Sequence, residues 1–206
     1  MKNIKNDLRE AYNKSAHERD TGLMQDWKIE ERSRFLSLLK QEKKESFLEI
    51  GAGPGRDSAF YQENGLKVLC TDLTPEMVKL CREKGLDARV MDFSDLQFPQ
   101  NSFNAVYAMN SLLHLPKKEL LKVLRKINRI LKRDGVFFMG VYGGIDHEGI
   151  WEEDAYEPKR FFSFYEDEHL KEILGEIFEV ISFRRINTGE SNRHLHFQSI
   201  LLRKKK

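Results

Sequence analysis

The chain has 206 residues and 40% of them are hydrophobic, which is enough for one ordinary domain with a sizeable core. Its 35 basic and 33 acidic residues nearly cancel, so the overall charge gives no support for a nucleic-acid-binding protein. The N-terminus lacks the apolar stretch of a signal peptide and no apolar run could span a bilayer, so we expect no membrane partner.

Residues 1–45 are predicted to form a helical cap segment and residues 46–206 the main domain, with the polar run KQEKKES (40–46) as the junction. In the main domain, short apolar runs alternate with helical patterns. This alternation predicts parallel strands joined by right-handed helical crossovers. The strands expected in this part are SFLEIG (46–51), KVLCTD (67–72), ARVMD (88–92), FNAVYAMNS (103–111) and GVFFMGVYGG (135–144).

The helices expected between these strands carry recognisable ends. The first covers residues 56–64, and the second begins at Pro75 and closes at Gly85. The third opens at Pro116 and keeps apolar residues at spacings of three and four, which predicts one buried face. Gly135 is expected to end it.

The last third of the chain departs from this alternation. A helix is expected within YEDEHLKEILGE (165–176), followed by two strand-like runs, FEVISFRRINTG (178–189) and HLHFQSILLRK (194–204). The polar turn ESNR (190–193) joins the two runs, and no helix fits between them, so they should pair as an antiparallel hairpin. The pattern therefore predicts a mostly parallel sheet with an antiparallel edge.

Three glycines, Gly51, Gly53 and Gly55, directly follow the first expected strand. Such a cluster indicates a sharp turn or the close approach of a ligand, because glycine has no side chain in the way. In an open α/β sheet, ligands bind beyond the carboxyl ends of the strands. Asp72 and Asp92 end the second and third expected strands, so glycines and acids share one edge. An acid at the end of the second strand can accept both hydroxyls of a ribose.

A dinucleotide-binding dehydrogenase would need the fingerprint G-x-G-x-x-G, but Arg56 stands where the last glycine belongs. The observed pattern is G-x-G-x-G, preceded by Glu49. The segments LEIGAGPGRDS, VLCTDLTPEMV, ARVMDFSDLQFPQNSFNAVYAMNSLLHL and LRKINRILKRDGVFF resemble, in order and spacing, the motifs of class I S-adenosylmethionine-dependent methyltransferases. The resemblance runs from about Ser46 to Tyr142 and points to the small-molecule branch around ubiquinone-biosynthesis and type 11/25 methyltransferase domains.

This resemblance implies a Rossmann-like, seven-stranded, mostly parallel sheet with helices on both faces and an antiparallel C-terminal hairpin. It also implies S-adenosylmethionine as cofactor and S-adenosylhomocysteine as its product. Glu49 would help to hold the methionine ammonium, Asp72 the ribose hydroxyls and Asp92 the adenine amino group. The other cofactor-binding residues that it implies are Gly51, Gly53 and Gly55 along the methionine and ribose, Leu73 and Phe93 at the adenine, and Asn110, largely through its backbone, at the methionine end.

His114 follows the fourth expected strand, at the edge where the methyl group would be presented. A neutral imidazole there could act as a general base near neutral pH. The alternative is a hydrogen-bonded histidine that shapes the pocket or caps the helix at Pro116.

The six histidines and two cysteines show no metal-ligand spacing, so no metal is expected. Cys70 lies in an apolar run and Cys81 in a helical pattern. We interpret both as reduced, buried thiols, which agrees with a cytoplasmic protein.

Contacts to a methyl acceptor are expected from the regions that the resemblance does not cover. Tyr12 is a candidate because related enzymes often place an N-terminal aromatic residue near the donor. The segment 144–167 is expected to form a lid, mobile from Gly144 to Phe164, with flexible backbone at Gly143 and an acidic run at 152–154 that argues against burial. The alternative is an ordinary connector packed on the core. The candidate substrate-binding residues of segment 144–167 are Trp151, Tyr156 and Arg160.

The sequence therefore predicts a methyltransferase that acts on a small molecule by in-line displacement. Two alternatives stay open at this point: an RNA or protein methyltransferase, supported only by the C-terminal run RKKK (203–206), and a non-catalytic module that binds the cofactor. We interpret RKKK as a solvated terminus and expect no nucleic-acid partner. The acceptor atom and the oligomeric state are left open.

Overall fold

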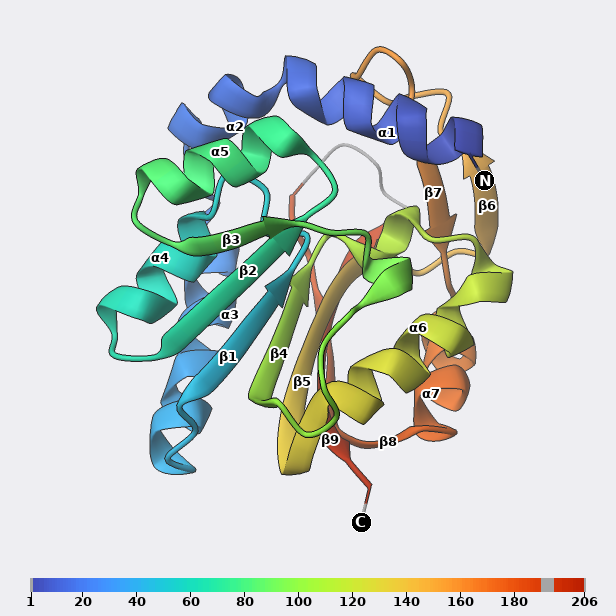
Figure 1. The fold of residues 1–206 in the computed structure, drawn as a ribbon. Helices are drawn as coiled ribbons and strands as arrows, with labels where there is room; N and C mark the ends of the chain where they lie inside the picture. The colour runs from blue at the N-terminus through green and yellow to red at the C-terminus, as the bar shows by residue number, and fades with distance from the viewer. Residues whose placement is uncertain (1, 190–194, 206) are drawn as a thin grey trace.

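The computed structural model describes residues 2–189 and 195–205 and shows a seven-stranded sheet between layers of helices (Figure 1). The strand order is β3-β2-β1-β4-β5-β9-β8, and β9 runs in the direction opposite to the other six strands of this sheet. The predicted fold class is confirmed, whereas the expected turn at 190–193 lies outside the described residues. The strands are β1 (Ser46–Ile50), β2 (Lys67–Asp72), β3 (Asp87–Val90), β4 (Phe103–Met109), β5 (Leu131–Gly143), β8 (Phe178–Ile186) and β9 (His196–Lys204).

The centre of the sheet determines where a ligand can bind. β1 pairs in parallel with β2 on one side and with β4 on the other, so the strand order reverses direction between β1 and β4. The chains that leave these two strands turn to opposite faces of the sheet. A crevice opens between them, and this switch point is the usual ligand site of open α/β sheets.

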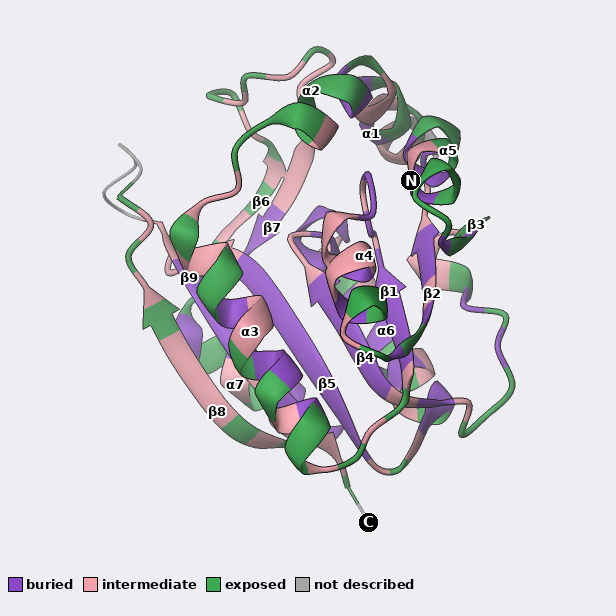
Figure 2. Cartoon of the chain, turned by 90° about the vertical axis from the view of Figure 1, so that its left-hand side faces the viewer, coloured by how far each residue is buried: buried purple, intermediate pink, exposed green. Residues whose placement is uncertain are grey.

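Helices cover both faces of the sheet and bury apolar side chains against it. Phe35, Leu36 and Leu39 of α3 pack with Phe47 and other residues of one face, and Leu124 of α6 belongs to the core of the other. In Figure 2 the inner strands are largely buried while the helices keep exposed outer faces. The helices after β1 are α4 (Arg56–Glu63), α5 (Pro75–Glu83), α6 (Lys117–Ile130) and α7 (Asp167–Gly175), with short 3-10 turns η1 (Phe93–Asp95) and η2 (Leu112–His114). None of the helices in the described part of the chain is long and apolar enough to cross a bilayer.

The helices of the first 45 residues lie in two different places. The helix α3 (Asp26–Gln41) packs on the sheet, whereas α1 (Lys2–Lys14) and α2 (Ala16–Thr21) lie over the carboxyl ends of the strands (Figure 1). Among the side chains of α1 whose burial is described, residues 4–14, only Leu8 and Ala11 are both buried and apolar. Of the predicted cap segment, α1 and α2 are therefore the part that covers the strand ends, and we call these two helices the roof. The apolar contacts of α1 are few, so by themselves they would hold this helix only weakly.

The prediction that the third helix ends at Gly135 is wrong. The helix α6 ends at Ile130, and β5 begins at the next residue, where Leu131 pairs with Phe103. The register then shifts before pairing resumes further along the strand, and Asp134 has a left-handed φ of 58°. Glycine at 135 therefore marks a kink inside a strand and not the end of a helix.

The segment 144–167 contains a second, two-stranded sheet, in which β6 (His147–Ile150) pairs antiparallel with β7 (Phe161–Phe164). Gly143 is not a flexible hinge, because it lies inside β5, where an added Cβ would come within 2.3 Å of Gln198 Oε1. Asp154 is not exposed either: its side chain is 4% accessible and is paired with Arg160. That this segment is a mobile lid stays a prediction.

Candidate functional site

A cavity of about 260 Å³ lies at the carboxyl edge of the sheet, and residues of α1 and α2 form part of its wall. The remaining wall comes from the loop between α2 and α3, from Lys28 of α3, and from the carboxyl ends of β1, β2, β3 and β4 with the segments that follow them. The cavity is therefore at the switch point described above. Of the residues predicted from the sequence, it brings together Tyr12, Glu49, Gly51, Gly53, Asp72, Leu73, Phe93, Asn110 and His114.

The three glycines after β1 have three different environments. An added Cβ at Gly51 would lie 2.4 Å from the Cβ of Ser111, so this position permits close packing of the β1 and β4 loops. Gly55, which is not part of the cavity wall, packs against Cys81 in the same way. Gly53 has a φ of +54° and nothing within 4 Å of an added Cβ. Among the three, Gly53 is the one that leaves open space for a ligand.

Asp72, at the end of β2, fastens the glycine loop. Its Oδ2 accepts a hydrogen bond from the Gly53 backbone N–H and its Oδ1 one from Thr74, both at 2.8 Å. Burial raises the pKa of Asp72, although these two hydrogen bonds oppose the shift. Each carboxylate oxygen keeps further acceptor capacity, so the side chain can also receive hydroxyl groups from the cavity.

Glu49 is a buried acid at the floor of the cavity, and Ser58 Oγ donates to its Oε2. Burial, followed by the neighbouring Asp57 carboxylate, raises the pKa of Glu49 well above its usual value. Asp57 also lines the cavity and is paired with Arg32, Nη1 to Oδ1 at 3.3 Å. With Asp72, three carboxyl groups face one cavity, and a cationic ligand would relieve the cost of their burial.

Two side-chain polar atoms just after β4 have no hydrogen-bond partner in the part of the chain that the structure describes. Asn110 has a left-handed φ of 53° and its backbone N–H donates to Gly140 O at 2.8 Å. Its side-chain Oδ1 is buried without a hydrogen bond among the described residues, and so is Oγ of Ser111. The backbone N–H of Asn110 is therefore used within the sheet, and the side-chain Oδ1 is an acceptor that a ligand could reach; that Asn110 acts largely through its backbone stays a prediction. Leaving such atoms unpaired costs about 1–3 kcal/mol each, which a polar ligand would remove.

Asp92 is the predicted cofactor residue that, with Gly55, lies outside the cavity wall. It caps η1 by accepting from the Ser94 N–H at 2.8 Å, and it is ion-paired with Lys5 of α1. Burial opposes its ionisation, but the hydrogen bonds from Lys5 and Ser94 outweigh burial and lower the pKa of Asp92. In this structure Asp92 therefore anchors the roof, while its neighbours Met91 and Phe93 face the cavity.

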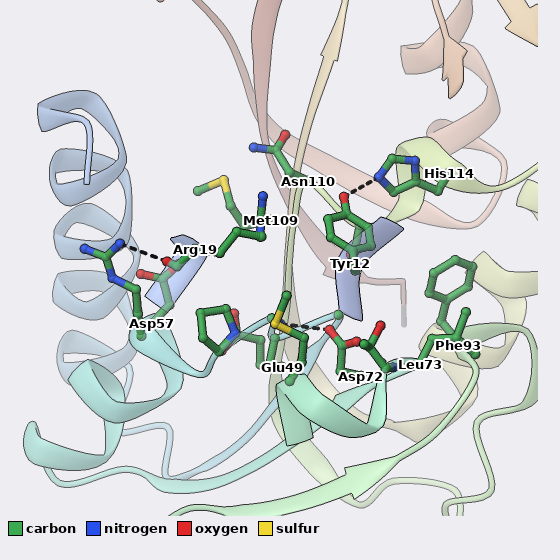
Figure 3. A pocket seen from close by; sticks show the side chains of 18 of the residues that line it. Tyr12, Arg19, Glu49, Asp57, Asp72, Leu73, Phe93, Met109, Asn110 and His114 are labelled. Carbon is green, nitrogen blue, oxygen red and sulfur yellow. Dashed lines mark hydrogen bonds between the residues drawn. The ribbon is translucent and has the colours of Figure 1, made fainter. Parts of the chain in front are cut away.

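His114 and Tyr12 form a hydrogen-bonded pair at the border of the cavity (Figure 3). The distance from Tyr12 Oη to His114 Nε2 is 2.7 Å, and Arg160 Nη1 lies 2.9 Å from Tyr12 Oη. Burial lowers the pKa of His114 to about 3. Of the other predicted substrate contacts, Tyr156 lies under the Arg160 guanidinium, and Trp151 packs on His147 and Phe164. None of Trp151, Tyr156 and Arg160 lines this cavity.

The methionines of this site were not predicted from the sequence. Met24, Met77, Met91 and Met109, four of the six methionines in the chain, line the cavity. Met91 and Met109 stand next to the predicted Asp92 and Asn110, so position at a strand end was the available signal. Arg19 and Lys28 carry no motif and became wall residues only because α2 and α3 reach the cavity. Within the described ranges, no group of three or more His, Cys, Asp or Glu side chains could hold a metal ion.

Comparison with known proteins gives a consistent picture. Residues 48–139 match a family model described as a methyltransferase domain. The chain is 36% identical over 99 residues to the ubiquinone biosynthesis O-methyltransferase of Xanthomonas oryzae, a match that covers 45% of this chain and 41% of that enzyme. It is 26% identical to an uncharacterized protein of Methanocaldococcus jannaschii, over 70% of this chain and 67% of that one.

Among solved structures, the fold resembles the 1,6-didemethyltoxoflavin-N1-methyltransferase of Burkholderia thailandensis, which was solved with that compound and S-adenosylhomocysteine bound. The TM-score is 0.71 at 24% identity, and the superposition covers 97% of this chain and 88% of the other. At this identity the likeness concerns the fold. The chain also spans less than half the length of the curated O-methyltransferases that it matches.

Proposed function

The chain carries an S-adenosylmethionine-dependent methyltransferase domain, and on this premise we propose that it methylates a small-molecule acceptor held beneath α1 and α2. The observation that carries the proposal is the cavity itself, in which Glu49, Gly53 and Asp72 converge from β1 and β2. Two matched proteins support a small acceptor by their names, the ubiquinone biosynthesis O-methyltransferase and the didemethyltoxoflavin methyltransferase.

The residues of the cavity fit S-adenosylmethionine. Asp72 would accept the ribose hydroxyls, and Leu73 and Phe93 offer apolar surfaces to the adenine. Glu49 complements a cationic methionine ammonium, and the unpartnered Oδ1 of Asn110 is a second acceptor for it. We assign no adenine contact to Asp92, because it does not line the cavity and is ion-paired with Lys5 of the roof.

When bound, S-adenosylmethionine supplies an activated methyl group on a sulfonium sulfur. The chain's own residues then have three tasks: to position the acceptor, to exclude water and to hold polar groups in place. The roof formed by α1 and α2 serves to exclude water, and it is fastened by Lys5 to Asp92 and by Tyr12 to His114.

His114 is better suited to hold Tyr12 than to remove a proton. Its pKa of about 3, caused by burial, keeps the ring neutral at physiological pH and makes it a weak base. Its Nε2 lone pair is already occupied by the Tyr12 hydroxyl. We therefore propose a positioning role for His114 in place of the general-base role considered from the sequence.

The C-terminal lysines support a small acceptor over a nucleic acid. Lys204 Nζ lies 3.0 Å from Asn101 Oδ1 and 2.6 Å from Leu131 O, and Lys205 Nζ donates to Gly175 O. These two ammonium groups are used within the fold and do not form a free basic patch. Cys70 and Cys81 are free and buried, which supports the proposed cytoplasmic location.

Two measurements test the proposal. Calorimetry should show binding of S-adenosylhomocysteine and none of NAD. A metabolite panel incubated with methyl-labelled S-adenosylmethionine should then yield a labelled small product. Binding without any transfer to small molecules, together with labelling of RNA or protein, would favour the macromolecular alternative, and binding without any transfer would favour the non-catalytic module.

A further inference from the structure

Three elements that are distant in the sequence meet at the hydroxyl of Tyr12. Tyr12 belongs to α1, His114 to η2, and Arg160 directly precedes β7. Tyr12 Oη lies 2.7 Å from His114 Nε2 and 2.9 Å from Arg160 Nη1. Figure 3 shows the first of these contacts at the cavity border.

The proton positions in this cluster follow from chemistry. His114 Nδ1 lies 2.8 Å from the backbone carbonyl of Phe161, and a carbonyl only accepts, so Nδ1 carries the proton. The neutral ring then offers Nε2 as an acceptor, and Tyr12 must donate to it. Arg160 can only donate, so Tyr12 Oη accepts from it. A hydroxyl has one proton and two lone pairs, which leaves Tyr12 with one free acceptor site and no free donor.

Arg160 is itself held in a fixed geometry. Its Nε lies 2.9 Å from Asp154 Oδ2 and its Nη2 lies 2.6 Å from Oδ1, a bidentate pair. The two side chains are only 12% and 4% exposed, whereas the neighbouring pair of Lys159 with Glu152 is 34% and 82% exposed. The guanidinium also lies 3.6 Å from the centroid of the Tyr156 ring. A buried ion pair is a weak source of stability, but it fixes the direction of the remaining Arg160 donor.

We propose that Arg160, held by Asp154, is a positioning residue that fixes the Tyr12 hydroxyl with its proton toward His114, so that Tyr12 offers its remaining lone pair as a hydrogen-bond acceptor at the cavity, and that the methyl acceptor presents an N–H or O–H group to it. This inference rests on the proposed function and narrows its substrate class. Amines that carry hydrogen, ring N–H groups and hydroxyls satisfy Tyr12. Tertiary amines and thioethers leave its free lone pair without a partner.

The first test needs no acceptor. In protein with 15N-labelled histidine and S-adenosylhomocysteine added, His114 should be protonated at Nδ1 and hydrogen-bonded at Nε2. Tyr12→Phe should shift the Nε2 resonance, and Arg160→Gln and Asp154→Asn should shift it in the same direction, whereas Arg160→Lys should restore part of the shift. Lys159→Gln is the matched control on the same segment and should leave it unchanged. A protonated Nε2, or a resonance that ignores Arg160→Gln, would overturn the positioning role.

The second test uses matched pairs of small compounds with methyl-labelled S-adenosylmethionine: secondary against tertiary amines, and phenols against thioethers. Transfer should be confined to the hydrogen-bearing member, and Tyr12→Phe and Arg160→Gln should lower kcat by at least about tenfold with the KM for S-adenosylmethionine unchanged. Transfer to tertiary amines or thioethers, or an unchanged kcat in Tyr12→Phe, would contradict the proposal. If the unmodified protein did not bind S-adenosylhomocysteine at all, the proposed function would be wrong. The hydrogen-bonding state of His114 can still be measured in that case, so the two failures can be told apart.

Discussion

Tyr12 and His114 are 102 residues apart in the sequence, yet their side chains are joined by a hydrogen bond of 2.7 Å. This contact connects the roof helix α1 to the turn that follows β4. It places a phenol and a neutral imidazole next to the end of the cavity that contains Asn110. The two residues have to be considered together, because each one determines the hydrogen-bonding state of the other.

Asp72→Ala should weaken binding of S-adenosylhomocysteine by at least roughly tenfold, because the ribose loses a charge-assisted acceptor. It should also lower the melting temperature, since the N–H groups of Gly53 and Thr74 lose their acceptor as well. Calorimetry and thermal unfolding measure the two effects. Asp87→Ala, at an exposed acid on β3, is the control and should change neither. Equal affinity of Asp72→Ala and the unmodified protein would place the ribose elsewhere.

Gly53→Ala should lower affinity for S-adenosylhomocysteine because its methyl group would occupy the open space of the cavity. The left-handed backbone should in addition cost about 1–2 kcal/mol of stability. Gly65→Ala provides a matched control, since Gly65 has a φ of +92° and nothing within 4 Å, but lies outside the cavity wall. Both variants should lose stability in chemical denaturation, and only Gly53→Ala should lose affinity. A similar affinity for both would mean that Gly53 serves the backbone alone.

His114 should make the protein less stable in acid. Its folded-state pKa of about 3 lies below the ordinary value of 6.5, so the unfolded chain takes up this proton first as the pH falls. The free energy of unfolding should therefore fall with decreasing pH between about 6.5 and 3, by at most about 1.4 kcal/mol per pH unit from this group. Above pH 6.5 the effect disappears. Denaturation curves of His114→Gln should show a shallower fall in this window.

The matched control for this measurement is His17→Gln, on the exposed surface of α2. Its pH dependence should follow that of the unmodified protein. If His114→Gln follows it as well, His114 is not held neutral by burial.

Asp92→Ala should loosen the roof more than it weakens cofactor binding. The variant breaks the ion pair with Lys5, so hydrogen exchange of α1 should speed up. Affinity for S-adenosylhomocysteine should fall by no more than about fivefold, because partly exposed pairs contribute about 0–1 kcal/mol. Asp95→Ala, at a largely exposed acid of η1, should leave α1 unchanged. A loss as large as that of Asp72→Ala would restore Asp92 as an adenine contact.

The tip of the β6–β7 hairpin, residues 152–159, should exchange its amides faster than β4 and β5 in the free protein. Its backbone groups are not part of a strand ladder: the N–H of Asp154 donates to Trp151 O, and the carbonyls of Glu152 and Glu157 accept from the side chains of Lys159 and Lys14. Addition of S-adenosylhomocysteine should slow exchange if the lid prediction is correct, because α1 and Arg160 become ordered together. Protection equal to that of the central strands without any ligand would show a static connector.

Much of the fold could be predicted because local patterns and the global architecture agree. The strands around the cavity are apolar runs, and each occurs close to its expected place. Two predictions about glycines were wrong. Gly135 was expected to end a helix but lies inside a strand, and Gly143 was expected to be flexible but makes room for Gln198. At Gly143 the neighbour comes from a distant part of the chain, whereas at Gly135 the nearest atom to an added Cβ is the carbonyl oxygen of Lys132, within the same kinked strand.

The residues of the candidate site also fall into those that a local pattern could place and those that depend on a distant element. Glu49, Asp72 and Asn110 could be predicted because the strand that carries each one also places it in the cavity. Asp92 ends the third expected strand just as clearly, but Lys5 reaches it from α1 and takes up its carboxylate. Contacts of this kind depend on how the N-terminal helices cross the sheet, which no local pattern records.

The position of β9 also sets the order in which the parts of the protein can form as it is synthesised. The strands that surround the cavity, β1 to β5, precede α7, β8 and β9 in the chain. Until β9 emerges, one edge of β5 is unpaired and β8 has no neighbour in the sheet. The nascent chain can thus build the half that holds the cofactor while its other half is still incomplete. An exposed apolar strand edge then has to be protected until residues 196–204 insert between β5 and β8.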